Sequence, residues 1–529
     1  MSESRDEYVY GHVLDALSGG LYPNKLDVIR EYLQNSYDAI REYIRQSDSE
    51  EEKERKKSEC KVIISIKGGS LFIYDNATGM DFQTLNEYRK IGFSRRPFGE
   101  FAGWRGIGKA AGLSVVEKLI VTTCQGKGVT YQLTFDANEM IGEVHSLRSG
   151  GENIPFNELI EKYSSIKTIK EGDEHYTSVE LHKIKSDAVE LLNHDRLKSH
   201  LSTIAPVPFN PDFKYKSEIE EQLEIAIEDY ISINLYLEDD IIYKPYKSEW
   251  VEVEGEVITK IDEPQYMPIY DKEGENLIAI CWYCMHSERG QIKTKINISG
   301  VPVNVGGLLY RSHDIRIGDA YLTRKTLWRT TPERSLWALG EIHILGESVE
   351  PTSDRNDFID NHSRYLLYEQ CRVIAQEISR RAGKLSDQSR AREKITEADN
   401  RIKDISAEVA SKTVPKPLVP SYIYEATALK KEAEKRKPKT PEEELKIIAD
   451  NVIKTADEIV KQLTDSLTNL TADAKVYSDI TEELKISEEG RLVYEAIIEA
   501  LQNYFANEPR TFEEIIRRIR KSLEDAFSS

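Results

Sequence analysis

The sequence contains few cysteines, and their positions argue against a disulfide framework. The five cysteines stand at positions 60, 124, 281, 284 and 371, which is too few and too irregular for a secreted scaffold. Cys281 and Cys284 form a single CxxC motif in the apolar run LIAICWYCMH. A structural zinc site needs four ligands, so two reduced cysteines in a buried strand are favoured over a metal site.

Long hydrophobic runs are missing as well. No stretch of about 18 apolar residues occurs, which argues against a membrane-spanning helix. The N-terminal stretch MSESRDEYVYGH lacks the basic-then-apolar pattern of a signal peptide. We therefore expect a cytoplasmic protein without a membrane partner.

A dense block of basic residues is the third absence. The chain has 72 Lys and Arg against 92 Asp and Glu, a net charge of −20, which opposes attraction to phosphate backbones. The clusters at 430–431, 435–437 and 517–521 lie close to acidic residues and are typical of solvated helix faces. Charge thus favours a protein partner over nucleic acid.

The chain does have the length and apolar content for several cores. Its 529 residues exceed the roughly 100 to 200 of one domain, and 39% are hydrophobic. Prolines at 206, 208 and 211 predict a first boundary, a helical pattern begins after Asn361, and the proline-rich run 413–420 interrupts it. We expect segments at 1–205, 206–360 (mixed α/β), 361–412 (helical connector) and 413–529 (helical).

Hydrophobic spacing predicts the local structure. Residues 26–45 have the spacing of an amphipathic helix, whereas the charged residues 48–57 predict a solvated loop or helix end. Further elements are expected as follows: a β-hairpin at 62–66 and 71–74, a mobile loop from 92 leading into a helix at about 107–117, and strands at 119–123, 130–135 and 178–182. The heptad-like spacing of Leu445 to Leu470 predicts a helical hairpin or coiled coil, within or between chains.

Three groups of residues in the first segment have a spacing that indicates a binding or catalytic site. Glu31, Asn35 and Asp38 stand at i, i+4 and i+7, on one side of the predicted helix. Asp75 ends the predicted hairpin, and Gly79 follows where backbone must approach something closely. Each group alone is also typical of an ordinary solvated face or turn.

The third group is rich in glycine. Gly103, Gly106 and Gly108 precede the predicted helix, with Ile107 and Lys109 beside them. Glycines at this spacing leave backbone N–H groups free to bind phosphate oxygens at the positive end of a helix dipole.

In this order the three groups resemble the motifs of the GHKL superfamily, which includes DNA gyrase B, heat-shock protein 90 chaperones, histidine kinases and MutL. REYLQNSYDA resembles the first motif, YDNATGM the second, GWRGIGKAAG the third and HYTSVEL a later strand, over about residues 8 to 210. The resemblance implies a Bergerat α/β sandwich that binds ATP with Mg²⁺ and hydrolyses it to ADP and phosphate.

The resemblance also implies roles for individual residues. Glu31 would be the general base for the attacking water, and Asn35 would hold the magnesium ion. Asp75 would accept the adenine amino group in a pocket shaped by Asp38, Gly79, Met80 and Thr177. The phosphates would lie against a lid of about residues 92–108, at Gly103, Gly106, Ile107, Gly108 and Lys109. Ala77 and Tyr176 depart from the family pattern, where glycine is common.

A fainter resemblance extends into the second segment. WALGEIHILGESVEPTSDRNDF is similar to the end of the heat-shock-90-like middle domain, and it implies that Arg355 reaches the terminal phosphate. A surface arginine in an acidic loop is the alternative. The presence of Glu31 argues against a histidine kinase.

The biological role stays open at this level. One hypothesis is a chaperone-like or remodelling ATPase, working as a homodimer on a protein partner bound through the C-terminal helices, in bacterial defence or stress. The alternatives are a DNA-associated clamp of the gyrase B or MutL type and a nucleotide-gated scaffold with little turnover.

Overall fold

A computed structural model describes most of the chain. The described residues are 22–97, 99–103, 105–126, 128–147, 154–170, 172–251, 257–285, 295–298, 301–345, 349–411, 418–467, 488–505, 512, 514–519 and 521. They form two compact units, residues 1–382 and 383–529. The finer boundaries at 205, 360 and 412 remain predictions. Within the described ranges, no helix has both the length and the apolar composition that a bilayer-spanning helix needs.

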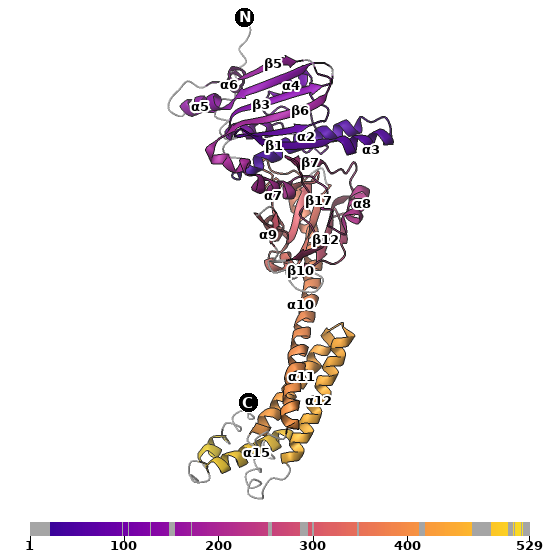
Figure 1. The fold of residues 1–529 in the computed structure, drawn as a ribbon, viewed down its shortest axis with the longest axis vertical. Coiled ribbons are helices and arrows are strands. Elements are labelled where there is room, and N and C mark those ends of the chain that lie inside the picture. Colours follow the sequence, from indigo (N-terminus) through magenta and orange to yellow (C-terminus); the bar gives the residue numbers. More distant parts are fainter. Residues whose placement is uncertain are drawn as a thin grey trace. The chain divides into compact units, whose positions relative to one another are not determined.

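The first unit begins with an eight-stranded mixed sheet (Figure 1). The strand order is β5-β4-β3-β6-β2-β1-β7-β8, and every pairing is antiparallel except the parallel pair β1–β7. The strands are β1 (Lys61–Lys67), β2 (Ser70–Asp75), β3 (Val116–Gln125), β4 (Thr130–Asp136), β5 (Ser164–Lys170), β6 (His175–Ile184), β7 (Asn234–Leu237) and β8 (Asp240–Ile241). Strands β7 and β8 thus join this sheet from beyond the proline-rich run at 206–211.

The core of this domain lies between the sheet and its helices. Alternate residues of the strands are buried, such as Val62 and Ile64 on β1, as expected of a sheet with one covered face. The helices are η1 (Lys25–Asp27), α2 (Val28–Arg45), α3 (Glu50–Glu59), α4 (Phe82–Tyr88), η2 (Gly108–Ser114), α5 (Ala137–Leu147), α6 (Phe156–Tyr163), η3 (Ser186–Leu192) and α7 (His194–Ile204). The predicted α/β sandwich and the helix over residues 26–45 are therefore present.

Two local predictions need correction. Residues 50–59 form a full helix, because Ser49 caps it and pairs such as Lys57–Glu54 and Lys56–Glu52 replace an apolar stripe. The predicted helix at 107–117 is the shorter 3-10 helix η2, and it ends before Val116 because that residue already pairs with Ile184 of β6. Non-local strand pairing here overrides the helical pattern.

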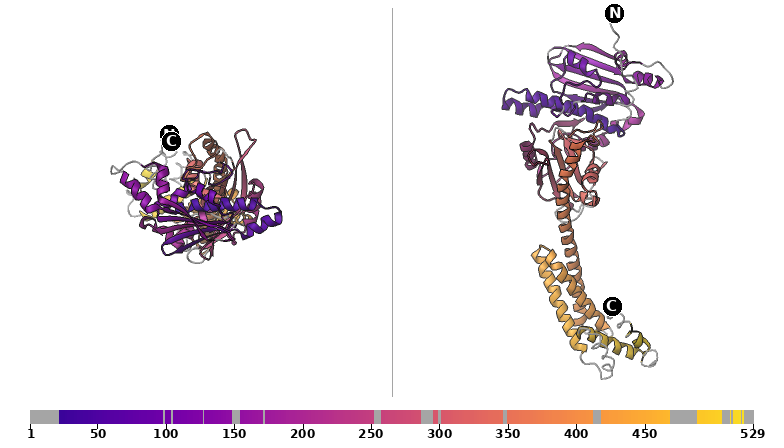
Figure 2. Two further views of the ribbon diagram at one scale, coloured as in Figure 1. Left: turned by 90° about the horizontal axis from the view of Figure 1, so that it is seen from above. Right: turned by 180° about the vertical axis from the view of Figure 1, so that it is seen from behind.

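The second domain of the first unit contains a five-stranded sheet of order β11-β12-β17-β15-β16, in which only β15–β17 is parallel. The strands and helices of this part are α8 (Lys216–Ala226), β9 (Glu249–Val251), β10 (Val257–Lys260), β11 (Gln265–Tyr270), β12 (Leu277–Met285), β13 (Lys295–Ile298), β14 (Val301–Asn304), β15 (Gly307–Ser312), β16 (Ile315–Ile317), α9 (Ala320–Leu327), η4 (Pro332–Trp337) and β17 (Ala338–Ile344). Helix α2 lies where the two domains meet (Figures 1 and 2).

The C-terminal region is helical, as predicted. Its helices are α10 (His362–Ala410), α11 (Val419–Arg436), η6 (Lys437–Lys439), α12 (Glu443–Leu467) and α15 (Glu488–Tyr504). In the second unit, α11 and α12 form a hairpin whose apolar faces, including Ile423 and Val452, share one core. Part of the proline-rich run, 412–417, and the end of the heptad pattern beyond 467 lie outside the described residues. Pairing between chains remains a prediction.

Candidate active site

A cavity of about 520 Å³ lies between α2, the end of β2, the lid and β6. It brings together all but one of the residues singled out from the sequence. The lining includes Glu31, Asn35, Asp75, Gly79, Met80, Gly103, Gly106, Ile107, Gly108, Lys109, Thr177 and Arg355. Asp38 is the exception.

Glu31 stands in the first turn of α2 and is almost fully buried. Gly108 makes this placement possible, because a Cβ atom at Gly108 would lie 2.1 Å from Oε2 of Glu31. Burial raises the pKa of the Glu31 carboxyl, and the charges of Arg355 and Arg30 oppose that rise. The hydroxyl group of Tyr22 lies within hydrogen-bonding reach of the same carboxyl and also lowers its pKa. The Glu31 carboxylate is therefore more basic than an exposed one and can accept a proton from water.

Asp75 lines the cavity at the C-terminal end of β2. Its carboxylate accepts hydrogen bonds from the Ser36 hydroxyl (2.9 Å) and the Ala77 N–H (3.2 Å). Burial raises the pKa of Asp75 to about 7, although both hydrogen bonds act against the rise. A buried carboxyl group with this pKa can change its charge near neutral pH when a donor arrives.

Threonines on the neighbouring strands complete this end. Thr177 on β6 stands opposite Asp75 and is also the cross-strand partner of Thr123 on β3. The two threonine hydroxyls lie 3.2 Å apart, and the Thr123 hydroxyl accepts a bond from the Met80 N–H at 2.8 Å. Sequence analysis missed Ser36 and Thr123, because only helix packing brings Ser36 to Asp75 and only strand register brings Thr123 to Thr177.

Gly79 lies against the backbone at the end of β3 in a left-handed conformation. Its φ is +64°, and a Cβ atom would lie 1.9 Å from the carbonyl oxygen of Cys124. Both the left-handed backbone and the close approach require glycine.

Asp38 is fully buried and contacts the lid instead of the cavity. Its carboxylate accepts bonds from the N–H groups of Ala102 (3.0 Å) and Gly103 (2.9 Å) and from Arg96 (3.2 Å). Asp38 thus binds the backbone of the lid and does not line the cavity. It also engages the Gly103 amide, which the sequence assigned to phosphate binding.

The rest of the lid folds back on itself. A Cβ at Gly106 (φ +67°) would lie 2.3 Å from the carbonyl oxygen of Phe93, and the Gly92 N–H donates to the Gly106 carbonyl at 3.0 Å. The ammonium group of Lys109 donates to the Phe93 carbonyl at 3.1 Å. Burial lowers the pKa of Lys109 to about 7, and the charge of Arg96 adds to this. Lys109 therefore lies at the lid, facing the cavity.

The second domain contributes Arg355 to the same cavity. Its guanidinium donates to the carbonyl of Ala102 in the lid, and burial lowers its pKa to about 10 against the opposing charge of Glu31. Two further bonds hold the Arg355 loop to the first domain. Arg30 donates to the Asp354 carbonyl at 2.6 Å, and Arg105 donates to the Pro351 carbonyl at 2.6 Å.

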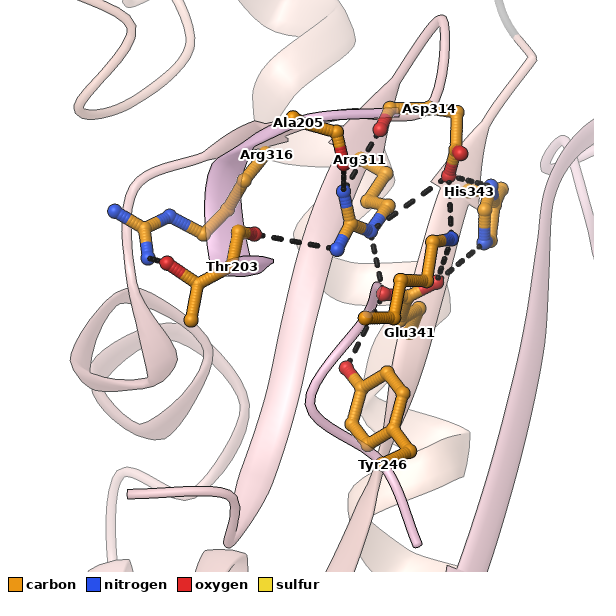
Figure 3. A network of polar contacts seen from close by, with 9 residues as sticks. Thr203, Ala205, Tyr246, Arg311, Asp314, Arg316, Glu341 and His343 are labelled. Carbon is orange, nitrogen blue, oxygen red and sulfur yellow. Dashed lines mark hydrogen bonds and ion pairs between the residues drawn. The ribbon is translucent and has the colours of Figure 1, made fainter. Parts of the chain in front are cut away.

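Two other groups could have bound a metal. Cys281 and Cys284 are buried in β12, and burial raises the pKa of both thiols, so they are protonated. Asp314, Glu341 and His343 converge in the second domain (Figure 3). The ammonium of Lys244 lies 2.8 Å from Asp314 and 3.0 Å from Glu341 and supplies the cation there.

Comparison with known proteins bears on the first domain. Residues 25–165 match the family described as "Histidine kinase-, DNA gyrase B-, and HSP90-like ATPase". The matched segment contains every predicted cavity residue except Thr177 and Arg355. No curated protein matches the chain significantly.

Proposed function

We propose that this chain, whose residues 25–165 match the histidine kinase-, DNA gyrase B- and HSP90-like ATPases, binds ATP in the cavity and hydrolyses it. One observation carries the proposal. A single cavity has the buried Asp75 carboxyl at one end and Glu31 together with Arg355 at the other.

The Asp75 end suits adenine. An exocyclic amine needs an acceptor, and a buried carboxylate is a strong one because water does not compete for it. Thr177, which also lines the cavity, is the cross-strand neighbour of Asp75, and its hydroxyl is hydrogen-bonded to that of Thr123. Asn35 lies between this end and Glu31 on α2, and its amide oxygen is a hard ligand of the kind that Mg²⁺ prefers. A magnesium ion held there would neutralise charge on the phosphates.

The opposite end suits hydrolysis. Glu31 is a buried carboxyl group that lines the cavity and has a raised pKa, and both properties suit a general base for water. Arg355 brings a positive charge to the same place, where charge develops on the terminal phosphate during transfer. Because Arg355 comes from the second domain, hydrolysis depends on that domain being docked.

The pH dependence of ATP affinity tests the adenine assignment. Below about pH 7 the free protein holds a proton on Asp75, and the adenine amine binds only the ionised form. Binding therefore releases a proton, and we expect the affinity to rise from pH 6 to pH 8 and level off above. Calorimetry at several pH values would measure this.

Two controls sharpen that test. Asp75→Asn is expected to weaken ATP binding by about 1.5 to 3 kcal/mol and to remove the pH slope. Purine riboside triphosphate carries the same titrating phosphates without the amine, so its affinity should depend less on pH. Equal slopes for the two nucleotides, or unchanged affinity in Asp75→Asn, would contradict the assignment.

The ATP cycle acts on a protein partner in this proposal. The net charge is −20, and several basic side chains of the helical region pair with carboxylates of the same region. Lys430 pairs with Asp457, Lys437 with Asp450 and Arg436 with Glu432. These pairs and the acidic net charge disfavour contact with a phosphate backbone.

Duplex DNA provides the test of this choice. Each phosphate contact adds to a steep dependence of binding on salt, with a slope of about −0.9 per contact. We expect no such salt-dependent mobility shift with the full chain, and no stimulation of its ATPase rate by DNA. Strong stimulation at low salt that disappears at moderate salt would instead indicate a DNA clamp.

A further inference from the structure

The central segment of the lid, residues 99–103, is held from two sides. On one side, α2 contacts it through Asp38 and through Arg41, whose guanidinium donates to the Glu100 carbonyl at 2.9 Å. On the other side, the second domain contacts it through Arg355 and through His313. Nε2 of His313 lies 3.0 Å from the carbonyl oxygen of Gly99.

His313 has an unusual backbone for its residue type. It forms, with Asp314, the two-residue turn between β15 and β16, and the two φ angles are +53° and +54°. Turns of this kind favour Asn-Gly, because a side chain in the left-handed region costs about 1 to 2 kcal/mol. Arg355, which also contacts residues 99–103 from the second domain, has a φ of +52°. Both residues thus have an unfavourable left-handed backbone, and each donates a hydrogen bond to a carbonyl of the lid, Gly99 or Ala102.

Buried ionic contacts and hydrogen bonds hold the turn of His313 and Asp314 in place (Figure 3). Asp314 pairs with Lys244, and the Arg311 guanidinium donates to the Asp314 carbonyl at 2.7 Å. The same guanidinium donates to the carbonyl of Thr203 (3.2 Å), at the end of α7 in the first domain. Since Lys244, Arg311 and Asp314 are almost completely buried, the turn cannot shift without disturbing them.

The protonation of the imidazole follows from its neighbours. Burial lowers the pKa of His313, with Arg41 and Arg355 adding to this and Asp38 opposing it, so the ring is neutral at pH 7. A carbonyl can only accept, so Nε2 carries the proton and donates to Gly99. Nδ1 then accepts from the Ser312 hydroxyl at 3.3 Å.

We infer that His313 is a positioning residue, which ties the lid to the second domain so that Arg355 and Glu31 face the same bound nucleotide. The inference rests on the proposed ATPase function and adds a contact to it. His313 lies outside the matched family segment, and neither His313 nor its hydrogen-bond partner Gly99 is among the residues that line the cavity.

His313→Gly tests the inference without straining the turn, because glycine suits the left-handed backbone. We expect kcat to fall about five- to tenfold, the equivalent of one lost hydrogen bond, and the ATP Kd to change less than twofold. Amide hydrogen exchange at residues 99–103 should accelerate, with or without nucleotide. His313→Gln, which keeps an N–H donor, should recover most of kcat.

Lys183→Gly is the matched control. Lys183 also has a left-handed backbone (φ +51°), but its ammonium group pairs with Glu117 of β3 and not with a lid residue, so kcat and lid exchange should stay unchanged. Wild-type kcat, or unchanged lid exchange, in His313→Gly would overturn the inference. If the wild-type chain binds no ATP, the proposed function fails, and lid exchange in the nucleotide-free protein still decides whether His313 holds the lid.

Discussion

Glu31→Ala is expected to abolish ATP hydrolysis while leaving ATP affinity nearly unchanged. The carboxyl group lies at the end of the cavity away from Asp75, so its removal leaves the adenine contacts in place. General bases contribute about 10² to 10⁴ in rate, and no second carboxylate among the described cavity residues lies beside Arg355 to replace it. Phosphate release under saturating ATP, together with calorimetry, would measure both effects.

Glu31→Gln is the matched variant, because it keeps the shape of the side chain next to Gly108 and removes only the basicity. Both variants should accumulate the ATP-bound state. Turnover of Glu31→Gln at the wild-type rate would show that another group activates the water. Weak ATP binding in both variants would instead assign Glu31 to nucleotide binding.

The sequence could predict those parts of the site that depend on local geometry. Glu31 and Asn35 face one cavity because i and i+4 positions share a helix side, whatever the rest of the fold does. Gly79 lies where its motif places it, because its left-handed turn is local. The fold class followed in the same way from periodicity and from the family resemblance.

The contacts of Asp38 could not be predicted from local spacing. Helical spacing puts it on the same side as Glu31, yet the lid folds back and covers it, so it contacts Ala102 and Gly103. No local pattern predicts that contact, because it depends on where the lid rests. Ser36, Thr123 and His313 were missed for the same reason, since packing or strand register brings each to its partner.

Arg355→Ala is expected to lower kcat by about 100- to 1,000-fold, the range typical for loss of one group that stabilises transition-state charge. ATP affinity should change little, because Arg355 comes from the second domain and is not among the groups that hydrogen-bond Asp75. Its charge also opposes the raised pKa of Glu31, so its removal raises that pKa further. The residual activity should therefore require a higher pH than the wild-type activity.

Two further variants separate the effect of the guanidinium charge from the effect of backbone strain at position 355. Arg355→Gly relieves the left-handed strain that alanine would keep, so an equal loss of kcat in both variants assigns the effect to the guanidinium. Arg355→Lys keeps a positive charge but not the planar group, and its pH profile should stay close to that of the wild type. If affinity fell while kcat at saturating ATP and the pH profile stayed unchanged, Arg355 would be a simple binding residue, and the dependence of hydrolysis on the docked second domain would be wrong.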